Sequence, residues 1–143
     1  LEADLTIAGH PLVTLHLASN QRDAAVFAYL EDIAPDSTVR YVTEGMLRAL
    51  HRTVSAPSPT YVTAWPPRNF TRAEASPLDP GETVEMRFAM LPTAWKFPAG
   101  HRIALSLAGA DRDNFALWPY GRPGHWRIMA GGEQASSLEL PVI

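Results

Sequence analysis

The amino-acid sequence predicts an all-β fold, a jelly-roll β-sandwich formed by one domain that covers residues 1–143. Three observations support this prediction. Apolar and polar residues alternate with a period of two in four separate runs, as in strands that bury one face. Residues that favour turns separate the runs. No segment has a convincing long helical pattern, and we expect about eight short strands in a chain of this size.

The four alternating runs lie near the N-terminus, in the second half of the chain and at the C-terminus. Each presents apolar side chains on one face and mostly polar or small ones on the other. The predicted core-facing residues are Val13, Leu15 and Leu17; Val84, Met86, Phe88 and Met90; Ile103, Leu105 and Leu107; and Leu138, Leu140 and Val142.

Four short segments have the composition of turns. AGHP (8–11) separates the first two strands, and APDST (34–38) forms a hairpin loop on proline and aspartate. LDPGE (78–82) includes Gly81, which can adopt positive φ. FPAGHR (97–102) leads into the strand that begins near Ile103.

Two segments need a separate interpretation. Thr43–Arg52 has near-helical apolar spacing, but β-branched residues lead into it and Gly45 lies within it, so we predict a strand. Thr53–Glu82 carries six of the thirteen prolines. Because proline lacks the N–H that a sheet requires, this segment is no central strand, and we predict a crossover between two sheets.

Composition excludes several classes of protein. The chain is 46% hydrophobic, carries a net charge of −3 without a basic stripe, and has no cysteine. We therefore expect no nucleic-acid partner, no disulfide and no membrane span. The chain starts at Leu1 rather than methionine and shows no signal peptide. We expect a cytoplasmic domain taken from a longer protein.

No pattern of residues indicates catalysis or a bound cofactor. The five histidines lack the spacing of zinc ligands. Asp111–Asn114 (DRDN) lacks the later ligands of a calcium loop and is more typical of a turn with side-chain-to-backbone bonds. A triad of Ser106, His101 and Asp111 is opposed by the absence of a G-x-S-x-G motif. We predict no catalytic residue, no metal and no cofactor.

Aromatic residues gather between Asn114 and Trp126, in a segment that glycines and prolines predict to be a loop. These rings either stack on a ligand or another domain, or fold back over the core. Pro119 and Pro123 would restrict the loop. The candidate residues for an interdomain surface or the edge of an active site are Asp111, Asp113, Asn114, Phe115, Trp118, Tyr120 and Trp126.

Several motifs in order resemble a known family. They are VTEGMLR (42–48), the PGE turn (80–82) and FPAGHRI (97–103). Together they resemble the C-terminal domain of the X-Pro dipeptidyl-peptidase and cocaine-esterase (CocE/NonD) serine hydrolases. The resemblance implies a jelly roll similar to galactose-binding domains, following an α/β-hydrolase domain that carries the catalytic residues and acts on acyl compounds. DRDNFALWPYGRPGHW (111–126) differs from the corresponding loop of the esterase branch.

The resemblance implies a non-catalytic accessory domain that packs on the catalytic domain of the same chain and shapes its active site. Its nucleophile motif has no counterpart here, so no catalytic residue carries over and His101 has a structural role. Self-association through an uncovered surface is a further expectation. The alternative is a carbohydrate-binding module, which would need aromatic rings aligned on one sheet face; Phe27, Tyr29, Tyr41 and Phe88 are the strand aromatics. A stand-alone enzyme is opposed by the missing motif.

Overall fold

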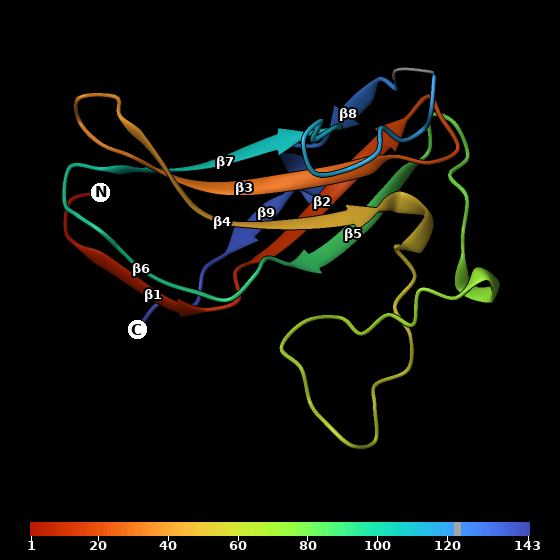
Figure 1. Ribbon diagram of the computed structural model, residues 1–143, viewed down its shortest axis with the longest axis horizontal. Coiled ribbons are helices and arrows are strands. Elements are labelled where there is room, and N and C mark those ends of the chain that lie inside the picture. Colours follow the sequence, from red (N-terminus) through yellow and green to blue (C-terminus); the bar gives the residue numbers. More distant parts are fainter. Residues whose placement is uncertain (122–123) are drawn as a thin grey trace.

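The computed structural model describes residues 1–121 and 124–143, and these form two antiparallel sheets packed face to face with a small third sheet at one end (Figure 1). The all-β sandwich predicted from the sequence is confirmed, and the helices are three short 3₁₀ turns in the described residues. The strands are β1 (Leu5–Gly9), β2 (Leu12–Ser19), β3 (Ala25–Ile33), β4 (Val39–Arg48), β5 (Thr83–Ala89), β6 (Thr93–Phe97), β7 (Arg102–Ala108), β8 (Trp126–Ile128) and β9 (Ser137–Glu139). The 3₁₀ turns are η1 (Ala49–His51), η2 (Arg72–Glu74) and η3 (Gly132–Gln134).

The front sheet has the order β4-β3-β7, and it faces the viewer in Figure 1. The loop 34–38 joins β3 to β4 as the predicted hairpin, and Thr38 N–H donates to Asp36 Oδ1 at 2.9 Å inside it. A bulge between Leu30 and Glu31 shifts the β3–β4 register. Thr43–Arg48 lies in β4 and not in a helix, as predicted, and only the following turn η1 is helical.

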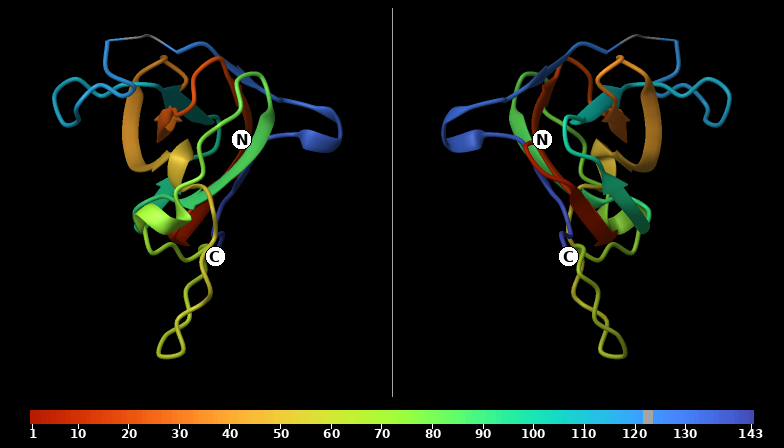
Figure 2. Two further views of the ribbon diagram at one scale, coloured as in Figure 1. Left: turned by 90° about the vertical axis from the view of Figure 1, so that its right-hand side faces the viewer. Right: turned by 90° about the vertical axis from the view of Figure 1, so that its left-hand side faces the viewer.

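The back sheet is centred on β2, which pairs with β5 along one edge. Along its other edge β2 pairs with β9 near its start and with β8 near its end. The segment between β8 and β9 projects from the back of the molecule (Figure 2). The small sheet pairs β1 with β6.

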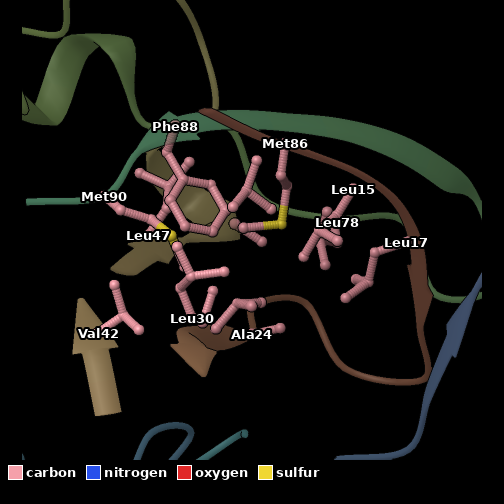
Figure 3. Close-up of a cluster of buried hydrophobic side chains, with 14 of the residues drawn as sticks. Leu15, Leu17, Ala24, Leu30, Val42, Leu47, Leu78, Met86, Phe88 and Met90 are labelled. Atoms are coloured by element: carbon pink, nitrogen blue, oxygen red, sulfur yellow. The ribbon is translucent and has the colours of Figure 1, made fainter. Parts of the chain in front are cut away.

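Large apolar side chains from both sheets fill the space between them (Figure 3). β2 contributes the predicted Val13, Leu15 and Leu17, and β5 contributes Met86 and Phe88. The inward face of β3 adds its own alternating set, Val26, Ala28 and Leu30. The alternation read from the sequence therefore assigns the core faces of β2 and β5 correctly.

Thr53–Glu82 crosses from β4 in the front sheet to β5 in the back sheet, as the prolines predicted. Its first half, residues 56–70, is an extended arm that projects away from the sandwich (Figure 2). The arm is fastened at its base by Arg68, whose Nη2 donates to the carbonyls of Arg52 at 3.0 Å and Arg87 at 2.6 Å. Burial lowers the pKa of this guanidinium.

Gly45 allows β4 to cross closely over the end of β5. A Cβ atom at this position would lie 2.7 Å from the Ala89 carbonyl oxygen and 2.9 Å from Met90 Cα. Both are backbone atoms, which move less readily than a side-chain end. The motif glycine of β4 is thus required by packing between the sheets rather than by a positive φ.

Sequence analysis missed two strands and misjudged the burial of a third. β6 alternates correctly, with Trp95 and Phe97 directed inward, but two prolines flank this short run. β8 falls where a loop was predicted. In β7, Leu105 faces the core but is only half-buried, because β7 forms the outer edge of the front sheet.

In the residues that the structure describes, no helix combines the length and apolarity needed to cross a membrane. At the C-terminus, Leu138 and Leu140 pack against the core as predicted. The prediction that Val142 faces the core is wrong: it lies beyond β9, is 55% exposed and forms only an isolated bridge with Ile7.

Truncation of Phe88 and of Leu105 should differ in effect. Phe88 is 3% exposed within the core, so Phe88→Ala should lower the free energy of unfolding by about 3–5 kcal/mol. Leu105→Ala should cost roughly 1–2 kcal/mol, since half-burial reduces both the transfer and the cavity contribution. Urea denaturation of the two variants measures both values. Equal losses would contradict the edge position of β7.

Candidate functional site

The candidate loop begins directly after β7 and folds over the outer face of the front sheet (Figures 1 and 2). We call residues 111–121 the docking loop. Its predicted continuation includes Pro123, which lies outside the described residues. Four of the predicted aromatic positions are described, and they have three different environments.

Asp111 begins the docking loop, and its hydrogen bonds form a turn there. Its carboxylate accepts hydrogen bonds from the Asn114 side-chain amide at 3.0 Å and from the Tyr29 hydroxyl at 3.1 Å. These bonds hold the pKa of Asp111 below its ordinary value of 3.8, and the bond from Asn114 has the largest effect. Burial, aided by the neighbouring carboxylate, raises the pKa of Tyr29. The interpretation of DRDN as a turn is confirmed, because Asn114 N–H donates to Asp111 Oδ1 at 3.3 Å and Phe115 N–H donates to the Asp111 carbonyl at 2.9 Å. Asp113 is exposed.

Phe115 folds back onto the front sheet. Its ring centroid lies 5.0 Å from that of Phe27, which points outward from β3. Phe27 is only 6% exposed as a result, whereas Phe115 remains 40% exposed. Phe115 therefore shields a sheet residue while its other face stays open.

Trp118 is fixed by Asp23, which precedes β3. The indole Nε1–H donates to Asp23 Oδ2 at 2.6 Å, and the ring lies 4.5 Å from the Arg48 guanidinium carbon. Arg48 donates to the same oxygen from Nε at 3.0 Å and from Nη2 at 2.5 Å. The other oxygen of Asp23 accepts the backbone N–H groups of Ala24 and Leu50 at 2.9 Å each. One carboxylate thus joins the docking loop, the end of β4 and the turn η1.

Tyr120 and Trp126 differ sharply. The Tyr120 side chain is 85% exposed and extends furthest into solvent among the docking-loop rings. Trp126 is not a loop residue, contrary to the prediction: it begins β8, is half-buried and packs against the core. A Cβ atom on Gly109 would lie 3.0 Å from the Trp126 ring, so the glycine makes room for it. One surface pocket is nevertheless lined by both Trp126 and Trp118, so a place of Trp126 in the candidate surface stays a prediction.

The docking loop and the outer face of β3 and β4 enclose a cavity of about 210 Å³. Its walls are almost entirely apolar and include Phe27, Met46, Phe115 and Trp118, with the stem of Arg48. A larger groove, about 700 Å³, lies between the arm and the strands β4 and β5. Phe115 and Trp118 fold back over the front sheet, which is one of the two predicted behaviours, and Tyr120 extends into solvent.

The residues of the imagined triad make other contacts. His101 Nδ1 lies 2.7 Å from Asp32 Oδ1, a carboxylate that is 2% exposed and also accepts Trp95 Nε1–H at 3.3 Å. The Ser106 hydroxyl donates to Glu31 Oε2 at 2.6 Å. The structural role expected for His101 is therefore present. The described residues contain no group of three or more histidine, aspartate or glutamate side chains suited to a metal ion.

Sequence analysis missed Asp23 and Arg48. They stand 25 positions apart along the chain. Arg48 is the last residue of the motif VTEGMLR, which indicated the family but not a contact with Asp23, and Asp23 belongs to no motif. The available signal was an aspartate directly before a strand of apolar residues, which is common at turns.

Loss of the Asp23 network should loosen the docking loop. We expect Trp118→Phe to lower the free energy of unfolding by about 1 kcal/mol, because it removes the N–H donor but keeps a ring. Hydrogen exchange across residues 111–121 should accelerate. Tyr120→Ser is the matched control and should change stability by less than about 0.5 kcal/mol. If Tyr120→Ser destabilises as much as Trp118→Phe, the anchoring role of Trp118 is wrong.

The Asp111 turn should open in acid. Because its pKa is lowered in the folded loop, the attachment is fully present above the ordinary value of 3.8 and is lost as the pH falls through the lowered pKa. Carbon-13 NMR titration of the Asp111 carboxyl group measures this, and Asn114→Ala should move the midpoint upward. An unchanged midpoint in that variant would show that Asn114 does not stabilise the ionised form.

Comparisons with known proteins identify the family. Residues 1–139 match the model described as the X-Pro dipeptidyl-peptidase C-terminal non-catalytic domain. The whole chain is 43% identical over 143 residues to a protein of Mycobacterium bovis named "Putative serine esterase", of which it covers 23%. A protein of Mycobacterium tuberculosis with the same descriptive name matches at 43% identity and 23% coverage.

Solved structures share the fold. A CocE/NonD family hydrolase from Staphylococcus aureus superposes with a TM-score of 0.79 at 18% identity, covering 100% of this chain and 29% of that one. An aminopeptidase from a marine sediment Thaumarchaeota archaeon gives a TM-score of 0.76 at 18% identity, with 100% and 24% coverage. An α-amino acid ester hydrolase gives a TM-score of 0.73 at 20% identity, covering 100% of this chain and 24% of that one. The chain spans about a quarter of the length of these relatives, and it belongs to the family of X-Pro dipeptidyl-peptidase C-terminal non-catalytic domains.

Proposed function

We propose that this chain is the accessory domain of a serine hydrolase and packs on the catalytic α/β-hydrolase domain of the same polypeptide. The observation that carries the proposal is the 43% identity over the full chain to serine-esterase-named proteins of which it forms only 23%. Esters or amides of acyl compounds are the proposed substrate class, since the relatives are named as an esterase, an aminopeptidase and an amino acid ester hydrolase.

The docking loop is the proposed contact with the catalytic domain and the edge of its active site. Tyr120 is 85% exposed and Trp118 is 43% exposed, although Asp111 and Asp23 hold both ends of the loop in place. Large rings on a fixed loop are typical of interfaces, because little further ordering is needed on binding. Self-association and a cytoplasmic location remain part of the proposal.

The carbohydrate-binding alternative has less support from the sheet aromatics. Phe27, Tyr29 and Tyr41 do share the outer face of the front sheet, whereas Phe88 lies in the core. Phe115 covers Phe27, and Tyr29 is half-buried beside Asp111. Of the three outward rings only Tyr41 is exposed, so they offer no open platform to a sugar.

The test compares three proteins: the full-length polypeptide that contains this domain, a truncation that lacks it, and the isolated chain. The isolated chain should not hydrolyse p-nitrophenyl esters or Xaa-Pro amides above buffer, because it has no nucleophile motif. The truncation should lose most of the full-length activity. Turnover by the isolated chain that a serine-directed phosphonate abolishes would refute the non-catalytic role, and a fully active truncation would refute the accessory one.

A further inference from the structure

We propose that the catalytic polypeptide covers the outer face of the front sheet, and that one of its large apolar side chains fills the cavity beneath the docking loop. This inference rests on the proposed function and extends it from a loop to a defined face with an anchor point.

The outer face carries a line of exposed apolar side chains. In the β3–β4 register, Tyr41 lies opposite Glu31, and Met46 lies opposite Phe27, so these side chains point away from the core. The exposed apolar residues on this face and on the loop above it are Val39 (54%), Tyr41 (56%), Met46 (40%), Phe115 (40%) and Trp118 (43%). They extend along β4 from its first residue to the docking loop, so they form a line of exposed apolar side chains rather than single scattered ones.

The remaining outward positions make the face accessible to a partner. On β7 three of them are small, namely Ala104, Ser106 and Ala108, and the fourth is Arg102, which pairs with Ile33. Glu31 accepts the Ser106 hydroxyl at 2.6 Å, and Arg48 is bound to Asp23. Glu44 lies opposite Tyr29 on the same face, so a partner that covers the face meets the charges of Glu44 and Arg102 as well as the small and apolar positions.

The cavity of about 210 Å³ is suited to a single leucine, methionine or phenylalanine side chain. Phe27, Met46, Phe115 and Trp118 are among the residues that line it. Because Asp23 fixes both Arg48 and Trp118, the cavity exists before any partner arrives. A preformed apolar pocket that takes a large side chain is a usual setting of a binding hot spot, and this one lies at the docking-loop end of the face.

The family description supports the catalytic polypeptide as the occupant, because the matching domain is C-terminal and makes up 23% of a relative. The Leu1 amino group donates to the His101 carbonyl at 2.7 Å, and Gly100 N–H donates to the Leu1 carbonyl at 2.9 Å. Leu1 therefore lies at the end of the sandwich where β7 begins, and the docking loop follows the other end of β7 (Figure 1). A polypeptide joined ahead of Leu1 enters at one end of the outer face. A partner that enters there and also contacts the docking loop spans the length of β7, roughly 20 Å, whereas β4 lies at the opposite edge of the sheet.

The arm is the competing surface. Tyr61 is 63% exposed and Val62 is 99% exposed, and the arm projects from the edge of the sandwich rather than from its front (Figure 2). Because both surfaces carry exposed apolar residues, the arm supplies matched control substitutions within the same chain.

The experiment uses the full-length polypeptide with Met46→Asp, with Tyr41→Asp and with Val62→Asp. The melting temperature of each variant, measured in the isolated chain, establishes whether the domain still folds. If Met46→Asp does not fold, Tyr41→Asp is used in its place. Hydrogen exchange then compares β4 and the docking loop between the full-length protein and the isolated chain. Because β4 already pairs with β3 in the isolated chain, we expect residues 39–48 and 111–121 to be more protected in the full-length protein than in the isolated chain. Met46→Asp or Tyr41→Asp should accelerate their exchange about tenfold or more, while Val62→Asp should leave it unchanged.

Each other outcome overturns the inference. Loss of protection in Val62→Asp alone would assign the contact to the arm. Protection of the isolated chain that increases with its concentration would assign the face to a second copy. If the face variants exchange normally while the truncation still loses activity, the proposed function stands and only this face is wrong. If the truncation is fully active, the proposed function itself fails.

Discussion

The carboxylate of Asp23 holds together the segments that would otherwise separate at one end of the sandwich. It accepts five hydrogen bonds, two from backbone N–H groups, two from Arg48 and one from Trp118. The side chain is 11% exposed, so each bond is made with little competition from water. Removing the carboxylate would leave a guanidinium and several N–H groups without acceptors, which is why an aspartate rather than a neutral residue suits this position.

The crossover between the sheets is organised by a different means. Proline-rich backbone has few N–H groups, and the chain compensates by using side chains as donors to carbonyls. Arg68 bridges the carbonyls of Arg52 and Arg87, and Ser55 and Glu74 join the two halves of the segment with a hydrogen bond of 3.1 Å. The base of the crossover is thereby fixed, and the arm beyond it is left free to extend from the sandwich.

These two devices place the candidate surfaces on a rigid framework. The docking loop is tied to β3 through Asp111 and Tyr29 and to β4 through Trp118 and Arg48. The outer face of the front sheet and the loop therefore behave as one unit. A partner that binds both would gain contacts without having to order either, which supports the proposed contact with the catalytic domain.

The amino-acid sequence determined the local features, because they depend on neighbours along the chain. Alternation in β2 and β5 assigned the core faces, prolines located the crossover, and Asp111 and Asn114 signalled their turn. Family membership followed from motifs spread over the chain, but the likeness to galactose-binding domains stays a prediction.

Tertiary structure alone decided which rings form the surface. Trp126 and Trp118 look alike in the sequence. Gly109 leaves space for the Trp126 ring to pack against the core, whereas Asp23 binds the Trp118 indole over the outer face of the front sheet. Burial of Leu105 was likewise set by the absence of a further strand beside β7 in the described residues. Such outcomes depend on contacts between residues as much as 95 positions apart, as between Asp23 and Trp118, and no local pattern encodes them.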